Sequence, residues 1–156
     1  MIKYYNTMVV FSEIPDEITL AINITNCPCH CPSCHSKFLW DDVGTVLNIE
    51  EVDRLIKLNE GITCVCFMGG DATPSEVNEL AHYVSTNFKN VKVAWYSGRD
   101  EISTEITPTY FDYIKIGRYD DRFGGLNKRT TNQKLFDIKN GFKNITQKFW
   151  KHDETV

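Results

Sequence analysis

The sequence predicts an α/β protein whose mainly parallel sheet is covered by helices on the outside. Strand-like segments alternate with helix-like segments in units of about thirty residues, as in βα repeats. Residues 62–68 (ITCVCFM) form a nearly continuous apolar run, which is typical of a strand covered on both faces. Asn140-Gly141 lies between two strand-like segments near the end of the chain, so a C-terminal hairpin is also expected.

The predicted strands are rich in β-branched and aromatic residues and are bounded by turn-forming residues. The first two flank Ile14-Pro15-Asp16 and are expected to pair as a hairpin, because proline and aspartate favour a turn. Strands are expected at residues 3–12, 17–25, 62–68, 91–96, 113–116, 134–139 and 142–148.

Two segments have a helical period. Asn48 is expected to cap the first, with Glu51 three residues later as in a capping box, and Gly61 to end it. Pro74 is expected to begin the second. The residues expected on the buried faces are Val52, Leu55, Ile56 and Leu58 in the first helix, and Val77, Leu80, Ala81 and Val84 in the second. Residues 117–129 are glycine-rich, charged and aperiodic, which predicts a long loop.

Length and composition limit the function classes. At 156 residues the chain is expected to form a single domain, residues 1–156. Its net charge of −4 argues against nucleic-acid binding, which needs a basic excess. Polar residues interrupt residues 1–17, so neither a signal peptide nor a membrane span is expected there. We therefore expect a cytoplasmic protein, in which six cysteines favour metal binding or redox chemistry over disulfides.

Residues 27–34 (CPCHCPSC) concentrate four of the six cysteines on one loop, directly after a predicted strand. The spacing Cys27-x3-Cys31-x2-Cys34 suits three ligands of an iron–sulfur cluster, because such a loop can converge its sulfurs on a compact metal core. Three protein ligands on a four-iron cluster leave one iron open to a substrate.

Two other interpretations of this loop stay open. A structural zinc site usually takes two ligand pairs that are a dozen or more residues apart, whereas these cysteines crowd together. The pair Cys31 and Cys34 also fits a thioredoxin-like motif, but this interpretation leaves Cys27 and Cys29 without a role. Cys64 and Cys66 lie within a predicted core strand, and core thiols are expected there rather than a second metal site. The cluster interpretation is favoured.

The cysteine spacing resembles that of radical S-adenosylmethionine (SAM) enzymes, and NCPCHCPSCHSKFLW is similar to the matching stretch of anaerobic ribonucleotide reductase-activating proteins. Pro32 and Trp40 match that pattern, Asn26 and Ser36 depart from it, and Cys29 has no counterpart. The resemblance implies a partial (β/α) barrel of the radical SAM type.

The same resemblance implies a [4Fe-4S] cluster that is held by Cys27, Cys31 and Cys34. Later segments support it: Lys115 to Tyr119 and residues 129–134 resemble two motifs of the reductase activases, although an aspartate is common where Lys115 or Ile116 stands.

The resemblance also implies a SAM site. Gly69, Gly70 and Asp71 resemble the Gly-Gly-acidic motif that binds the amino group of SAM, and an acidic acceptor beside side-chain-free backbone suits that role. Ser97 falls where the family places a polar residue near the ribose or carboxylate, although a surface turn would equally explain it. Ser33 occupies the position whose residue lies near the adenine of SAM in this family. The cysteine loop and the segments at 69–71 and 97–98 each follow a predicted strand, so all three are expected at one rim of the sheet.

The activity that the resemblance implies is that of an oxidoreductase that activates a glycyl-radical enzyme. An electron from a flavodoxin or ferredoxin cleaves SAM, and the resulting 5′-deoxyadenosyl radical takes a hydrogen from a glycine of the anaerobic ribonucleotide reductase large subunit. No catalytic side chain beyond the cluster and SAM is implied. Two alternatives remain: an activase of a formate-lyase type of enzyme, and a non-enzymatic electron carrier with Cys29, Cys64 or Cys66 as a fourth ligand.

Overall fold

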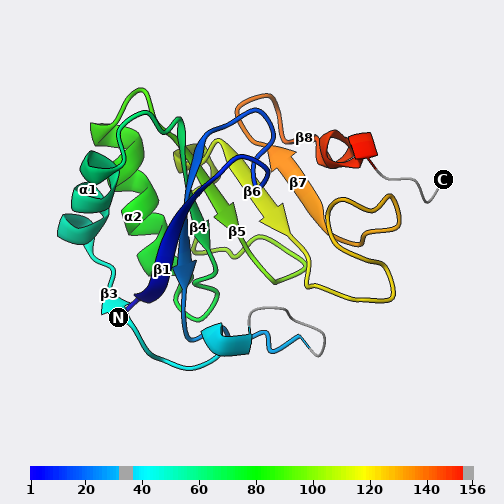
Figure 1. Cartoon of the computed structure of the whole chain (residues 1–156), viewed down its shortest axis with the longest axis horizontal. Coiled ribbons are helices and arrows are strands. Elements are labelled where there is room, and N and C mark those ends of the chain that lie inside the picture. Colours follow the sequence, from blue (N-terminus) through cyan, green and yellow to red (C-terminus); the bar gives the residue numbers. More distant parts are fainter. Residues whose placement is uncertain (32–36, 153–156) are drawn as a thin grey trace.

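The computed structural model describes the backbone of residues 1–31 and 37–152, with side chains up to residue 150. In this part of the chain, eight strands form one mixed sheet in the order β3-β1-β2-β4-β5-β6-β7-β8 (Figure 1). The strands are β1 (Lys3–Val10), β2 (Thr19–Ile24), β3 (Thr45–Val46), β4 (Cys64–Met68), β5 (Lys92–Tyr96), β6 (Tyr113–Ile116), β7 (Lys134–Asp137) and β8 (Lys143–Asn144). The helices are α1 (Ile49–Leu58) and α2 (Pro74–Asn87), with 3-10 turns η1 (Lys37–Leu39), η2 (Pro108–Tyr110) and η3 (Thr146–His152).

The expected mainly parallel, partial (β/α) barrel with helices outside is wrong. β2, β4, β5 and β6 pair in parallel, but β1 pairs antiparallel with β2 and β3, and β7 pairs antiparallel with β6 and β8. Antiparallel pairings therefore outnumber parallel ones by four to three in the described chain, which contains two α-helices. The reason lies in the connections. Among the described residues, no α-helix separates β1 from β2, β6 from β7 or β7 from β8, so these consecutive strands return antiparallel, and β5 reaches β6 with only η2 between them.

The two helices form where the sequence predicts them. The Asn48 side chain accepts a hydrogen bond from the Glu51 backbone N–H at 2.9 Å, which satisfies a donor that the first turn of α1 would otherwise leave free. Pro74 occupies the start of α2, where its missing N–H costs nothing. All the expected buried positions are buried except Leu58, which is 66% exposed at the end of α1.

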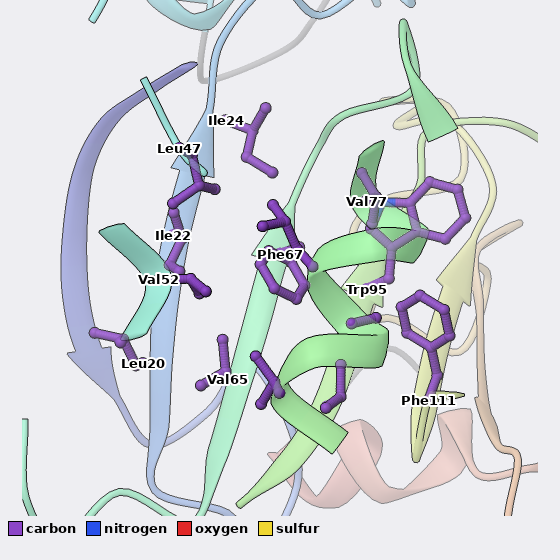
Figure 2. Close-up of a cluster of buried hydrophobic side chains, with 14 of the residues drawn as sticks. Leu20, Ile22, Ile24, Leu47, Val52, Val65, Phe67, Val77, Trp95 and Phe111 are labelled. Carbon is purple, nitrogen blue, oxygen red and sulfur yellow. The ribbon is translucent and has the colours of Figure 1, made fainter. Parts of the chain in front are cut away.

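Both helices pack on the same face of the sheet, side by side (Figure 1). The strands supply this layer from alternate positions, because side chains along a strand point to opposite faces. Figure 2 shows Phe67 in the middle of the layer, between Leu20 and Ile22 from β2 on one side and Trp95 and Phe111 on the other. This core is large and continuous, and it leaves the other face of the sheet to be covered by loops.

The second face is covered by the β1–β2 connection and by η3. Ile14 from the connection is fully buried against the sheet, and Phe149 from η3 packs on the same cluster. The Tyr96 hydroxyl donates to the Glu13 carbonyl and ties the connection to β5. Cys64 and Cys66 lie fully buried beneath this cover, as expected for core thiols, and burial raises the pKa of both.

The turn after β4 is shaped by two glycines. Gly69 and Gly70 have φ of 113° and 93°, which only glycine adopts readily. A β-carbon on Gly70 would also lie 2.5 Å from the Val77 Cγ2 atom, because α2 begins close beneath the turn.

Within the described residues, no helix has the length and apolar character needed to cross a membrane.

Replacing Gly70 with alanine should therefore destabilise the fold for two reasons, which are backbone strain at positive φ and overlap of the new β-carbon with Val77. Gly61 is a matched control, with φ of 90° and no other atom within 4 Å of the place that a β-carbon would take. Gly61→Ala should cost about 1–2 kcal/mol through backbone strain alone. Gly70→Ala should cost about 1–3 kcal/mol more, because its β-carbon overlaps Val77. Urea unfolding measures the free energy of unfolding of both variants. Equal losses would contradict the prediction, because they would show that α2 moves away from the new β-carbon at no energetic cost.

Candidate functional site

Three loops at the carboxyl end of the parallel strands meet at the side chain of Asp71. Its carboxylate is buried and accepts hydrogen bonds from the Ser97 hydroxyl at 2.6 Å and from the Gly98 backbone N–H at 2.8 Å. The Cys29 thiol lies 3.7 Å from the Asp71 Oδ2 atom. The predicted meeting of the cysteine loop with the turns at 69–71 and 97–98 is therefore confirmed for the residues that the structure describes.

The glycine turn is fixed in place by β5. The Trp95 indole N–H donates to the Gly69 carbonyl at 2.7 Å, and the Gly69 N–H donates to the Tyr96 carbonyl at 3.1 Å. Both bonds orient the turn so that Asp71 follows it at the rim. The backbone conformation at positions 69 and 70 is enough to explain why both residues are glycine. Asp71 is therefore the residue of this motif whose side-chain chemistry points to a candidate site.

The entrance to the cysteine loop turns sharply after β2. Asn26 has φ of 60°, in the left-handed region that asparagine tolerates better than most residues. Its N–H donates to the Asp41 carbonyl at 3.0 Å. The His30 ring stacks on Trp40 at 4.4 Å between centroids, with 10° between the planes. These contacts hold the loop against residues 40 and 41, which lie in the segment that leads away from it.

Within the loop, Cys27 and Cys29 perturb each other. A hydrogen bond from Cys29 lowers the pKa of the Cys27 thiol to about 6, and the same contact raises the pKa of Cys29. Cys27 is therefore the thiol that ionises first, and the thiolate is the form that binds metals. A β-carbon on Gly98 would lie 2.9 Å from the Cys29 sulfur, so the absence of a side chain at position 98 makes room for Cys29. The resemblance assigned no role to Cys29, and only the electron-carrier alternative used it, as a fourth ligand.

A pocket of about 400 Å³ opens beside the cysteine loop. Cys29 and Cys31 line one side, and the loop after β6 lines the other. The lining residues from that second loop are Arg118, Tyr119, Asp120, Asp121 and Arg122. The volume falls within the range of small-molecule sites, roughly 300–1,000 Å³. The combination of two thiols, two arginines and two carboxylates can bind a ligand that carries charges of both signs.

Lys115 lies buried on β6, at the same rim. Its ammonium group donates to the Gly117 carbonyl at 3.0 Å and lies 5.3 Å from the centre of the Tyr96 ring. Burial lowers the pKa of Lys115 to about 8, and the charge of Asp71 partly opposes that effect. The sequence contained one signal for this residue, a lysine inside the apolar strand YIKI.

Of the remaining predicted site residues, Ser97, Cys27 and Cys31 lie in the described part of the chain, and Ser33 and Cys34 do not. Ser97 is fully buried; it donates to Asp71 and accepts from the Arg99 N–H at 3.1 Å, so it positions the carboxylate. Cys31 is buried and lines the pocket, while Cys27 is half-buried.

The donor chemistry fits an iron–sulfur cluster as far as the described ligands extend. Cys27 and Cys31 offer soft thiolate ligands, one with a lowered pKa, beside a pocket that can admit a second ligand. Among residues 1–31 and 37–150, no group of three or more histidine, cysteine, aspartate or glutamate side chains could hold a metal ion. The third predicted ligand, Cys34, is beyond that range.

Comparisons with known proteins do not assign the chain to a family. No family model matches the chain, and no curated protein or solved structure shows a significant match either. The radical SAM resemblance therefore rests on the sequence motifs alone.

The buried charge of Lys115 should make the stability of the metal-free protein depend on pH. The folded-state pKa of about 8 lies below the ordinary value near 10.4, so the unfolded chain holds this proton more tightly. The resulting cost is complete below pH 8 and disappears as the pH rises towards 10.4. Lys115→Met should accordingly stabilise the protein at pH 7, on the order of 1–4 kcal/mol, with the advantage closing by about pH 10.

Urea unfolding at several pH values measures this difference. Lys143→Met on the exposed strand β8 controls for loss of a positive charge and should show little change at any pH. A Lys115→Met variant that is less stable than the wild type at pH 7 would contradict the prediction.

Proposed function

We propose that this protein is a radical SAM activase, which uses a [4Fe-4S] cluster and SAM to generate a glycyl radical on the large subunit of an anaerobic ribonucleotide reductase. The observation that carries the proposal is the junction at Asp71, where the cysteine loop, the glycine turn and Ser97 meet beside a pocket. This site, and not the fold, supports the proposal, because the sheet is not the barrel that the resemblance implies.

The residues of the chain would divide the work as follows. Cys27, Cys31 and Cys34 hold the cluster, and the pocket beside Cys31 receives SAM. When bound, the cluster and SAM supply a one-electron cleavage that ends with removal of a glycine hydrogen from the partner. Lys115 places a positive charge at the same rim and so favours ionised thiols around it.

Asp71 retains capacity for a cationic ligand. An ionised carboxylate offers about four acceptor positions, and Ser97 and Gly98 occupy two of them with short hydrogen bonds. The thiol contact at 3.7 Å is long and weak by comparison. Asp71 can therefore accept from the amino group of SAM while its two protein donors hold it in position.

The partner would close the site. The pocket is lined by loop residues throughout, and radical chemistry requires that water be excluded from the reacting atoms. Arg118 and Arg122 are exposed at its mouth, on the loop that follows β6. We infer that the reductase subunit docks over this loop, and that a flavodoxin or ferredoxin supplies the electron in the cytoplasm.

The cluster ligands can be tested by iron loading. Anaerobically reconstituted wild-type protein should bind about four irons per chain. Alanine at Cys27, Cys31 or Cys34 should abolish this binding, because each removes a thiolate ligand. Cys29→Ala is the matched control from the same loop, and it should retain the iron. Loss of iron in Cys29→Ala alone would show that the ligands are assigned wrongly. A wild-type protein that binds no iron would contradict the proposed function as a whole.

The activase function is tested by electron paramagnetic resonance. Reduced protein incubated with SAM and an anaerobic reductase large subunit should produce a glycyl-radical doublet that is absent without the subunit. Changing Arg118 and Arg122 to alanine should weaken the signal while leaving iron loading intact, because those residues lie at the docking surface. Arg54→Ala on α1 serves as a control, since Arg54 is exposed but distant in the fold. Turnover of a small molecule without any protein partner would contradict the activase assignment.

A further inference from the structure

One edge of the sheet is only partly covered. Strand β1 pairs with β2 along Tyr4 to Val10 on its inner side, but β3 pairs only with Lys3 and Tyr4 on its outer side. Within the described chain, the outer edge of residues 5–10 therefore has no strand partner. Backbone N–H and C=O groups of an edge strand point outward in alternation, so this edge carries a row of unsatisfied donors and acceptors.

The composition of this edge favours a protein partner over solvent. From residue 4 to residue 12 (YYNTMVVFS) there is no charge, no proline and no glycine. Natural proteins normally protect an open edge with lysine, proline, a bulge or a covering segment, and the register shift of β1 at Tyr5 leaves residues 6–10 regular. Here Tyr5, Met8 and Val9 are instead 56%, 54% and 42% exposed. An uncharged edge that is rich in β-forming residues is suited to pairing with another strand.

The strand that fits best is β1 of a second copy. Two identical strands that pair antiparallel are related by a two-fold axis, and such an interface closes on itself as a dimer. With the axis at Met8, Met8 lies opposite Met8 of the other copy and Asn6 lies opposite Val10, because residues that face each other in an antiparallel pair have their side chains on the same face of the sheet. No like charges face each other in this register. Because each chain carries a net charge of −4, two copies meet with least repulsion along an uncharged strip.

We propose that the protein forms a two-fold dimer by antiparallel pairing of residues 6–10 of β1, which joins the two sheets into one. The inference is independent of the proposed activity. The exposed apolar area of the strip is on the order of 300 Å² per chain, less than the roughly 800 Å² per partner of a standard interface. A weak dimer, with a Kd in the micromolar range, is therefore expected.

Sedimentation velocity over a concentration series, from about 1 to about 300 µM, tests the dimer directly. The metal-free wild-type protein should shift from monomer to dimer across this range. Hydrogen exchange should show residues 6–10 becoming more protected as concentration rises, while α2 stays unchanged. A monomer at every concentration would overturn the proposal, and so would dimerisation without added protection of this strand.

Charge variants at Met8 test the register. Met8→Lys should weaken the dimer about tenfold or more, because the two-fold axis brings the two introduced charges close together. Leu58→Lys is the matched control, since Leu58 is 66% exposed on α1 and away from the edge. Circular dichroism should show that both variants fold.

A mixture of Met8→Lys with Met8→Glu gives the sharpest result. Opposite charges near the axis should restore association to at least the wild-type level, which a folding defect or a remote surface would not produce. A Met8→Lys variant that dimerises as the wild type does, or a Leu58→Lys variant that loses the dimer equally, would place the contact elsewhere and overturn the proposal.

Discussion

The buried carboxylate of Asp71 is the interaction on which the arrangement of the site depends. It joins its own loop to two others that are far apart in the sequence, through Ser97 and Gly98 in one and Cys29 in the other. Hydrogen bonds to a charged group contribute about 1.5–3 kcal/mol each, so this junction is strong enough to fix the loops at the rim. The opposite end of the sheet has a comparable junction, where buried Glu17 accepts from Lys92 at 2.9 Å. One junction stabilises the scaffold, and the other reaches a pocket through Cys29, which contacts Asp71 and lines that pocket.

The glycine turn illustrates how a motif can carry two kinds of information. Its backbone conformation and the close approach of Val77 require glycine at position 70 whether or not a ligand binds. The same turn, whose Gly69 backbone groups bond to β5, places Asp71 at the junction. Glycine alone is therefore weak evidence for a cofactor, and the acidic residue that follows it is stronger evidence. In the sequence the motif stands as one unit, whereas the structure separates its parts.

The sequence predicts local elements better than their pairing. Periodicity and caps locate the helices α1 and α2, and the shared rim follows from the rule that strand ends meet. The barrel prediction is wrong because pairing is a tertiary choice: nothing local states that β7 returns antiparallel to β6. Leu58 continues the apolar period but lies past the contact with the core. The roles of Cys29 and Lys115 depend on neighbours that are distant in sequence, so spacing could not reveal them.

Lys115 and Cys27 together show how the rim is balanced electrostatically. A buried ammonium group destabilises the fold, and a thiol with a lowered pKa introduces negative charge at neutral pH. Asp71 adds to the negative side and lies close enough to raise the pKa of Lys115 against the effect of burial. Apart from the junction at Glu17, both faces of the sheet are packed mainly with apolar side chains, so much of the buried charge lies where ligand chemistry can use it.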